Sequence, residues 1–143
     1  MKTHLLLVLS MLLTGLLTHA QSETVPMSNR QALHHIKQVF DNYMKDREPA
    51  DPQVDKDLMR QSLQALNKVS DPNALELLLD VWLEYDLPDF PNRTLVYRIF
   101  KNSRPESIRA VKSRLGHSKA LKSEENAQYG ELVDLIKQLE GEP

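Results

Sequence analysis

Residues 60–83 read RQSLQALNKVSDPNALELLLDVWL, and residues 93–116 read RTLVYRIFKNSRPESIRAVKSRLG. At an offset of 33 residues, the two stretches match in apolar, basic and turn-forming positions. In each, one apolar helical pattern ends, a Ser-x-Pro corner follows, and a second apolar pattern begins. Such a period is typical of stacked helical pairs. The matched residues are Arg60 and Arg93, Leu63 and Val96, Leu66 and Ile99, Lys68 and Lys101, Ser70 and Ser103, Pro72 and Pro105, Leu75 and Ile108, Leu78 and Val111, and Trp82 and Leu115.

The same helical spacing continues on both sides of the repeat. Apolar residues recur at steps of three and four, and no run alternates between apolar and polar residues as a strand would. The pattern predicts an all-α chain of about six helices, arranged as stacked antiparallel pairs or as a compact helical bundle. The expected helices cover residues 28–46, 54–69, 72–85, 92–102, 103–116 and a last stretch that includes Ala127, Leu132, Leu135, Ile136 and Leu139.

Capping signals set the expected ends of these helices. A Ser with a Gln or Glu three residues later forms a capping box, Asp before Pro starts a helix, and Gly stops one. The third helix is apolar nearly all round, which predicts that it lies at the centre of the core. The capping residues are Ser28 with Gln31, Asp71 before Pro72, Ser103 with Glu106, and Gly116.

The first 20 residues, MKTHLLLVLSMLLTGLLTHA, are typical of a secretory signal peptide cleaved after Ala20. An uncleaved membrane anchor is the alternative, but the apolar run over residues 5–17 is shorter than the roughly 20 residues that span a bilayer. We therefore expect an exported protein, periplasmic or extracellular, without a membrane span after cleavage. A flexible leader at residues 21–27 would precede one domain at residues 28–143.

Charge is distributed unevenly along the second half of the chain. Residues 71–92 carry six acids and no base, residues 93–122 carry nine bases and one acid, and residues 123–143 are acidic again. The net charge of the whole chain is only −2, which argues against nucleic acid as a partner. The chain has no Cys, so it must rely on a packed core without disulfides.

The sequence of residues 57–83, DLMRQSLQALNKVSDPNALELLLDVWL, resembles the HEAT-like repeat of α-solenoids. It has an Arg-containing helix with alanines and leucines, then Asp-Pro, then a Leu-rich helix. Residues 93–116 are similar but lack the Ala positions and the Asp before Pro, and the period is shorter than the usual 40–47 residues. The resemblance covers residues 57–115. It implies a right-handed stack of antiparallel helix pairs that binds proteins, and it implies no catalytic residue.

No residue constellation in the sequence indicates catalysis, a metal or a cofactor. His34 and His35 are neighbours about 100° apart on one helix, so they cannot both face one ion. The acids Asp51, Asp55 and Asp57 lack the central Gly and final Glu of a calcium loop. We therefore predict a protein that is not an enzyme and has no cofactor.

The basic segment supplies the first candidate for a partner-binding surface. Arg98 and Lys101 are three residues apart on the fourth helix, and Arg109 and Lys112 are three apart on the fifth, so each pair shares one helix face. Such a face would steer and orient an acidic protein partner. The alternative is that these charges face water or offset the acidic helices beside them.

The turn at residues 85–91 supplies the second candidate. Leu87 and Phe90 stand on a turn stiffened by two prolines, where an apolar pair can anchor a partner. The same residues could instead fold back over the core as a lid. Asn92-Arg93-Thr94 is an acceptor motif for N-glycosylation, but it falls at a helix start where a glycan fits poorly.

These observations favour an exported, non-catalytic protein-binding module that docks a partner through a basic helical face. One alternative is a structural or assembly accessory of the cell envelope, in which the helical stack serves as a spacer. Another is an immunity- or inhibitor-type protein that blocks an envelope enzyme.

Overall fold

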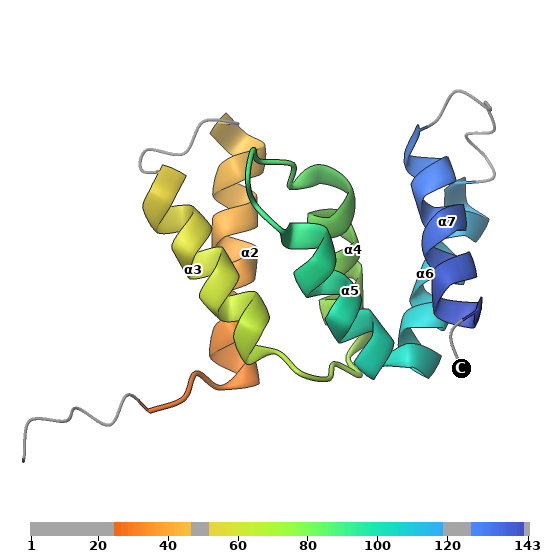
Figure 1. The fold of residues 1–143 in the computed structure, drawn as a ribbon, viewed down its shortest axis with the longest axis horizontal. Helices are drawn as coiled ribbons and strands as arrows, with labels where there is room; N and C mark the ends of the chain where they lie inside the picture. Colours follow the sequence, from red (N-terminus) through yellow and green to blue (C-terminus); the bar gives the residue numbers. More distant parts are fainter. Residues whose placement is uncertain (1–24, 47–51, 119–126, 142–143) are drawn as a thin grey trace, which may run out of the picture.

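The computed structural model describes residues 25–46, 52–118 and 127–141 (Figure 1). Six helices and no strand occur in this part of the chain, which confirms the all-α prediction. The expected signal peptide at residues 1–20 lies outside the described residues. The helices are α2 (Asn29–Asp46), α3 (Pro52–Ala65), α4 (Pro72–Glu84), α5 (Asn92–Asn102), α6 (Arg104–Ser118) and α7 (Ala127–Gly141).

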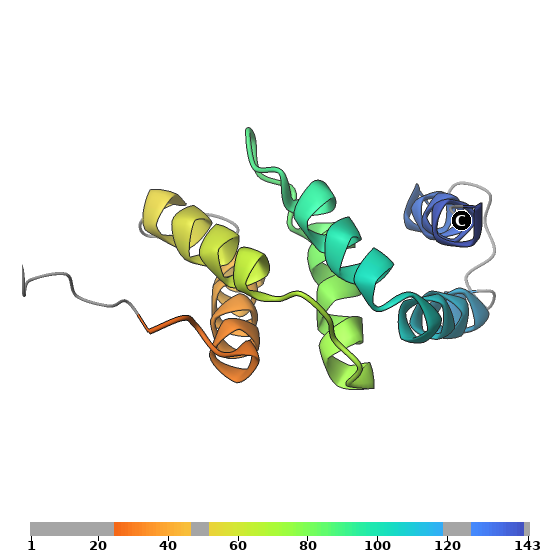
Figure 2. The same cartoon turned by 60° about the horizontal axis from the view of Figure 1, so that its bottom comes forward.

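The helices form three antiparallel pairs that stand side by side, α2 with α3, α4 with α5, and α6 with α7 (Figure 1). Turning the view shows two layers: α2, α4 and α6 make up one, and α3, α5 and α7 the other (Figure 2). The 33-residue offset of the sequence relates α3 to α5 and α4 to α6. In both cases the two related helices pack against each other within one layer.

Helix α4 lies at the centre, in contact with α2, α5 and α6. Its apolar residues therefore face neighbours on several sides, as the sequence predicts for a helix with so little polar surface. The buried residues of α4 are Ala74, Leu75, Leu78, Leu79, Val81 and Trp82. They join one core with buried side chains of the other helices, such as Ile36, Met59, Phe100, Val111 and Leu135.

Two of the predicted helix starts are confirmed at atomic detail. The Ser28 hydroxyl accepts the Gln31 N–H, and the Gln31 side chain accepts the Ser28 N–H at 3.0 Å, which is a capping box. Asp71 caps α4 by accepting the N–H groups of Asn73 and Ala74 at 2.8 and 3.0 Å. Local side chains therefore satisfy backbone donors that the helices leave unpaired.

The predicted end of the second helix is wrong. Helix α3 ends at Ala65, whereas the sequence indicates an end at Val69. The Leu66 N–H still bonds to the Ser62 carbonyl of α3, but after Leu66 the backbone bonds to side chains at the C-terminal end of α5. The Ser103 hydroxyl accepts the Val69 N–H at 2.8 Å, and Asn102 donates to the Asn67 carbonyl at 3.1 Å. Groups more than 30 residues away thus take over the bonds that would have extended α3.

The predicted stop at Gly116 is also wrong, because α6 runs through this residue to Ser118. A glycine ends a helix by adopting a positive φ, and Gly116 does not have one. Its Cα faces open space, so the residue is accommodated as an ordinary helical position.

Candidate functional site

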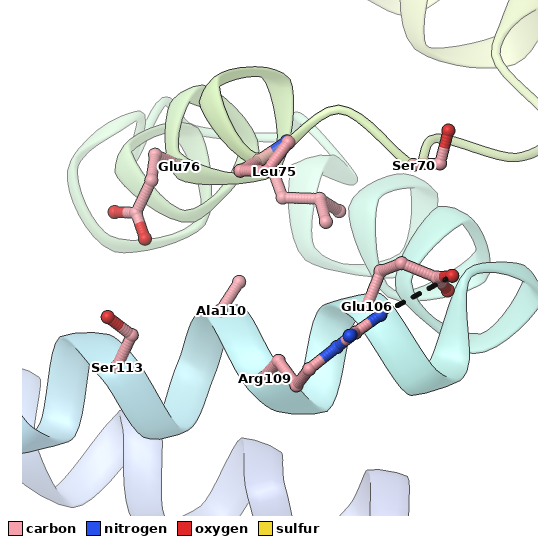
Figure 3. Close-up of a pocket in the computed structure, with 8 residues that line it drawn as sticks. Ser70, Leu75, Glu76, Glu106, Arg109, Ala110 and Ser113 are labelled. Atoms are coloured by element: carbon pink, nitrogen blue, oxygen red, sulfur yellow. Dashed lines mark ion pairs between the residues drawn. The ribbon is translucent and has the colours of Figure 1, made fainter.

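An open groove lies between α4 and α6 on the α2/α4/α6 layer (Figure 3). Its volume is about 350 Å³. We call it the α4–α6 groove and define it by the eight residues that line it: Ser70, Pro72, Leu75, Glu76, Glu106, Arg109, Ala110 and Ser113. It forms where the two helices related by the sequence repeat pack side by side.

The α4–α6 groove has an apolar floor and a charged edge. Leu75 of α4 and Ala110 of α6 point toward each other across it (Figure 3). Arg109 lies at its edge with 75% of its side chain exposed, and its guanidinium is 3.7 Å from the Glu106 carboxylate. Arg109 is the exposed end of this long ion pair, whereas the Glu106 side chain is 27% exposed; the contact contributes little to stability, so the guanidinium can turn to a new carboxylate at a small cost in free energy. The groove can therefore hold an apolar side chain next to an acidic one.

Arg114 fixes the relative position of α4 and α6. It donates to Oε2 of Glu76 from both Nε and Nη2, and to Oδ1 of Asp80 at 2.8 Å. Partial burial lowers the pKa of the Arg114 guanidinium, but the hydrogen bonds and charges of Glu76 and Asp80 outweigh that effect and raise it. The guanidinium is therefore permanently charged, and it holds Glu76 in place at the wall of the α4–α6 groove.

A second open groove lies on the same layer between α2 and α4, with a volume of about 570 Å³. Glu76 lines both grooves, so they are neighbours across α4. We call this one the α2–α4 groove. Its lining residues are Leu33, His34, Lys37, Phe40 and Asp41 of α2, and Asp71, Asn73, Ala74, Glu76, Leu77 and Asp80 at or within α4.

The predicted basic residues do not share one set of neighbours. Arg98 reaches α3 and donates to the carbonyl oxygens of Leu63 and Leu66 at 2.8 and 2.9 Å. Lys112 pairs with Glu140 of α7 at 2.6 Å. Lys101 is exposed on α5, and Arg109 lines the α4–α6 groove.

Arg98 and Lys112 therefore bind groups of the protein itself. The fold brings Arg109 alone of the four to a groove among those described here. The hydrogen bonds of Arg98 make it a cap for the C-terminal carbonyl groups of α3, which are left unpaired by the helix.

The predicted loop residues fold back toward the core. Phe90 is 8% exposed and packs edge-on against Tyr85, with ring centroids 5.4 Å apart, and Leu87 is half-buried. Of the two arrangements that the sequence leaves open for these residues, the structure has the one that folds back over the core. Asp89 adopts a φ of 60°, and the Phe90 N–H bonds to the Leu87 carbonyl at 3.2 Å, which closes a tight turn over the helices.

Tyr85 is the buried centre of this turn region. It is 1% exposed, and its ring also packs against Tyr43 at 4.9 Å. Its hydroxyl is buried without a hydrogen-bond partner. Burial, together with the nearby Asp55 and Tyr43, raises the pKa of Tyr85 to about 12.

Asn92, the acceptor of the glycosylation motif, is 7% exposed. Its side-chain amide donates to the carbonyl oxygens of Val81 and Tyr85, and so caps the end of α4. A glycan on this nitrogen would break both bonds and would have no room in the folded protein. The structure thus agrees with the poor fit expected from the sequence.

Sequence reasoning missed the Arg114 bridge and the α2–α4 groove. A signal for the bridge exists, because Glu76 and Asp80 stand four residues apart on an otherwise apolar helix and so share one face. The position of Arg114 on the neighbouring helix depends on how α6 packs, which the local sequence does not specify.

Within residues 25–46, 52–118 and 127–141, no group of three or more His, Cys, Asp or Glu is placed to hold a metal ion. None of the helices in these ranges is both long enough and apolar enough to cross a membrane. Comparison with protein-family models, curated proteins and solved structures finds no match to this chain.

Proposed function

We propose that this chain is an exported, non-catalytic protein-binding module whose partner docks in the α4–α6 groove. The observation that carries the proposal is the composition of this groove, an apolar floor of Leu75 and Ala110 beside the exposed Arg109. A partner segment with an acidic side chain next to a small apolar one complements it. The signal-like sequence of residues 1–20 supports a periplasmic or extracellular location.

The proposal keeps the acidic partner expected from the sequence but narrows the docking residues to Arg109 and its groove. Arg98 and Lys112 already bind groups of the protein, so a partner would have to compete for them. Arg109 has only a long contact to Glu106, so little free energy is lost when its guanidinium turns from Glu106 toward a partner.

The test compares the full chain, carrying a C-terminal tag, with its Arg109→Glu variant in cells that express the protein natively. Proteins bound to the tagged chain are captured from the envelope fraction and quantified. The matched control is Arg30→Glu, which reverses an exposed charge at the start of α2. Because Arg109→Glu places an acid opposite the partner's acid, we expect about tenfold less captured partner.

The control should capture the same amount of partner as the unmodified chain. Equal capture by the Arg109→Glu variant would contradict docking in the α4–α6 groove. No captured protein with any of the three chains would contradict the binding function itself.

A further inference from the structure

The α2–α4 groove differs from its neighbour in charge. Its walls carry four carboxylates, Asp41 on α2 and Asp71, Glu76 and Asp80 at or within α4, against the single cation Lys37. Counting only carboxylates and lysine, the formal charge of the lining residues is −3, and Arg114, which binds Glu76 and Asp80 from α6, reduces it to −2. The α4 wall carries three of these acids, whereas on the α2 wall Asp41 is paired with Lys37, so the groove attracts cationic groups mainly along α4.

Each of these carboxylates can accept a further hydrogen bond. Lys37 binds Oδ2 of Asp41, and Arg114 binds Oε2 of Glu76 and Oδ1 of Asp80. Asp71 accepts two backbone N–H groups on its Oδ1. In the part of the chain that the structure describes, these bonds use one oxygen of each carboxylate and leave the second for another donor. The existing bonds hold the carboxylates in place, so a cationic ligand meets acceptors that are already oriented.

The floor of the α2–α4 groove is apolar. Leu33 and Leu77, which line it, are half-buried, and the lining residues Phe40 and Ala74 are each 8% exposed. Along α4, the acids from Asp71 to Asp80 span nine residues, or about 13 Å at the helical rise. An apolar strip of this length between the acidic α4 wall and Asp41 of α2 matches two to three turns of a helix with an apolar face and basic flanks.

We propose that the α2–α4 groove binds a cationic amphipathic helix of a partner protein, with apolar side chains on Leu33 and Leu77 and Lys or Arg side chains on the acidic α4 wall and at Asp41 of α2. An acidic segment would meet the repulsion of the four carboxylates, and a purely polar cation would leave the apolar floor uncovered. This inference rests on the proposed function only in taking the chain to be a protein-binding module; it does not require docking at Arg109.

The probes are three synthetic peptides of about 14 residues, which is two heptads. The first has leucines along one helical face and lysines on both sides of it. The second replaces its lysines with glutamates, and the third replaces its leucines with serines. Binding of each labelled peptide to the full chain is measured by fluorescence anisotropy at low and moderate salt.

Two charge reversals locate the site. Asp41→Lys changes the α2 wall of the groove, and Asp134→Lys is the matched control on α7. Both aspartates are exposed, by 56% and 71%, and each pairs with a lysine of its own helix, so neither variant disturbs the core. Asp41→Lys changes the charge of the α2 wall by two units, close to a lysine of the bound peptide. It should therefore weaken binding of the first peptide about tenfold.

We expect the first peptide to bind at least about tenfold more tightly than either of the others, and Asp134→Lys to change its affinity less than about twofold. Equal binding of the first and third peptides would overturn the inference, because it would indicate adventitious attraction of cations to acidic residues. Equal weakening by the two charge reversals would overturn it as well. So would sedimentation showing that a second copy of the chain fills the groove and excludes the peptide.

The result is distinguishable from a failure of the proposed function. Arg109 does not line the α2–α4 groove, so Arg109→Glu should leave peptide binding unchanged even if it abolishes capture of the native partner.

Discussion

Replacing Arg98 with Met should destabilise the fold rather than remove a partner. The Arg98 guanidinium donates to the carbonyl oxygens of Leu63, Gln64 and Leu66 at 2.8, 3.3 and 2.9 Å, where α3 ends. Methionine keeps much of the apolar stem of the side chain but removes its charge and its donors. The variant therefore isolates the contribution of the cap.

The magnitude follows from these bonds. Hydrogen bonds to a charged group contribute about 1.5–3 kcal/mol each when buried, and a cation at a helix C-terminus adds about 0.3–1 kcal/mol. Arg98 is exposed, so water partly replaces the lost donors. We therefore expect a loss of about 1–2 kcal/mol in the free energy of unfolding, or a drop in melting temperature of about 4–10 °C.

The assay is urea unfolding of the full chain followed by circular dichroism, with Lys68→Met as the control. Lys68 is an exposed lysine in the turn after α3, and its replacement should change stability by less than about 0.5 kcal/mol. Equal stability of the Arg98→Met variant and the unmodified chain, together with loss of captured partner, would refute the capping role and restore Arg98 as a docking residue.

Three further predictions concern pH, salt and processing. The pKa of Tyr85 is raised from 10.0 to about 12 in the folded state. The stabilisation linked to its neutral hydroxyl is therefore fully present below pH 10. Between pH 10 and 12 the unfolded state ionises first, and the free energy of unfolding falls by about 1.4 kcal/mol per pH unit. Urea unfolding at pH 7 and 11 should therefore show a smaller alkaline loss for Tyr85→Phe, and an equal loss would contradict the assignment. Arg114→Met should lower stability by about 1–2 kcal/mol at low salt and by less near 1 M salt, measured in the same assay, because the bridge to α4 is partly exposed and screened. Mass spectrometry of the exported protein should give Gln21 as the first residue, whereas retention of residues 1–20 would contradict cleavage.

Local sequence signals are sufficient for the number and order of the helices, although they misplace the C-terminal ends of α3 and α6. The spacing of apolar residues predicted six helices, and the bounds of Asn92–Asn102 agree with the structure at both ends. The Ser28 and Asp71 caps were predictable because a cap binds backbone groups two or three residues away. The central position of α4 is also predictable from its own residues, because a helix that is buried on several sides has apolar residues nearly all round.

Contacts between distant residues account for what the sequence did not indicate. From its sequence position, Arg98 is a surface cation on a helix. Its role as a cap arises because the fold brings it to the end of α3, whose carbonyl groups are 32–35 residues away in the chain. Phe90 follows a turn, and its burial depends on Tyr85 and on α3, where Lys56 donates to the Pro88 carbonyl at 3.1 Å. The α4–α6 groove likewise exists only once the two helices have packed, although the sequence itself indicates Arg109 as a candidate docking residue.

The most direct test of docking in the α4–α6 groove is site-specific photo-crosslinking in cells that express the protein natively. A photoreactive amino acid is placed at Ser113, an exposed residue lining this groove, and separately at Gln61, an exposed residue of α3 in the opposite layer. We predict a single crosslinked partner from position 113 and none from position 61. Crosslinking from position 61 alone, or from neither position, would contradict the account.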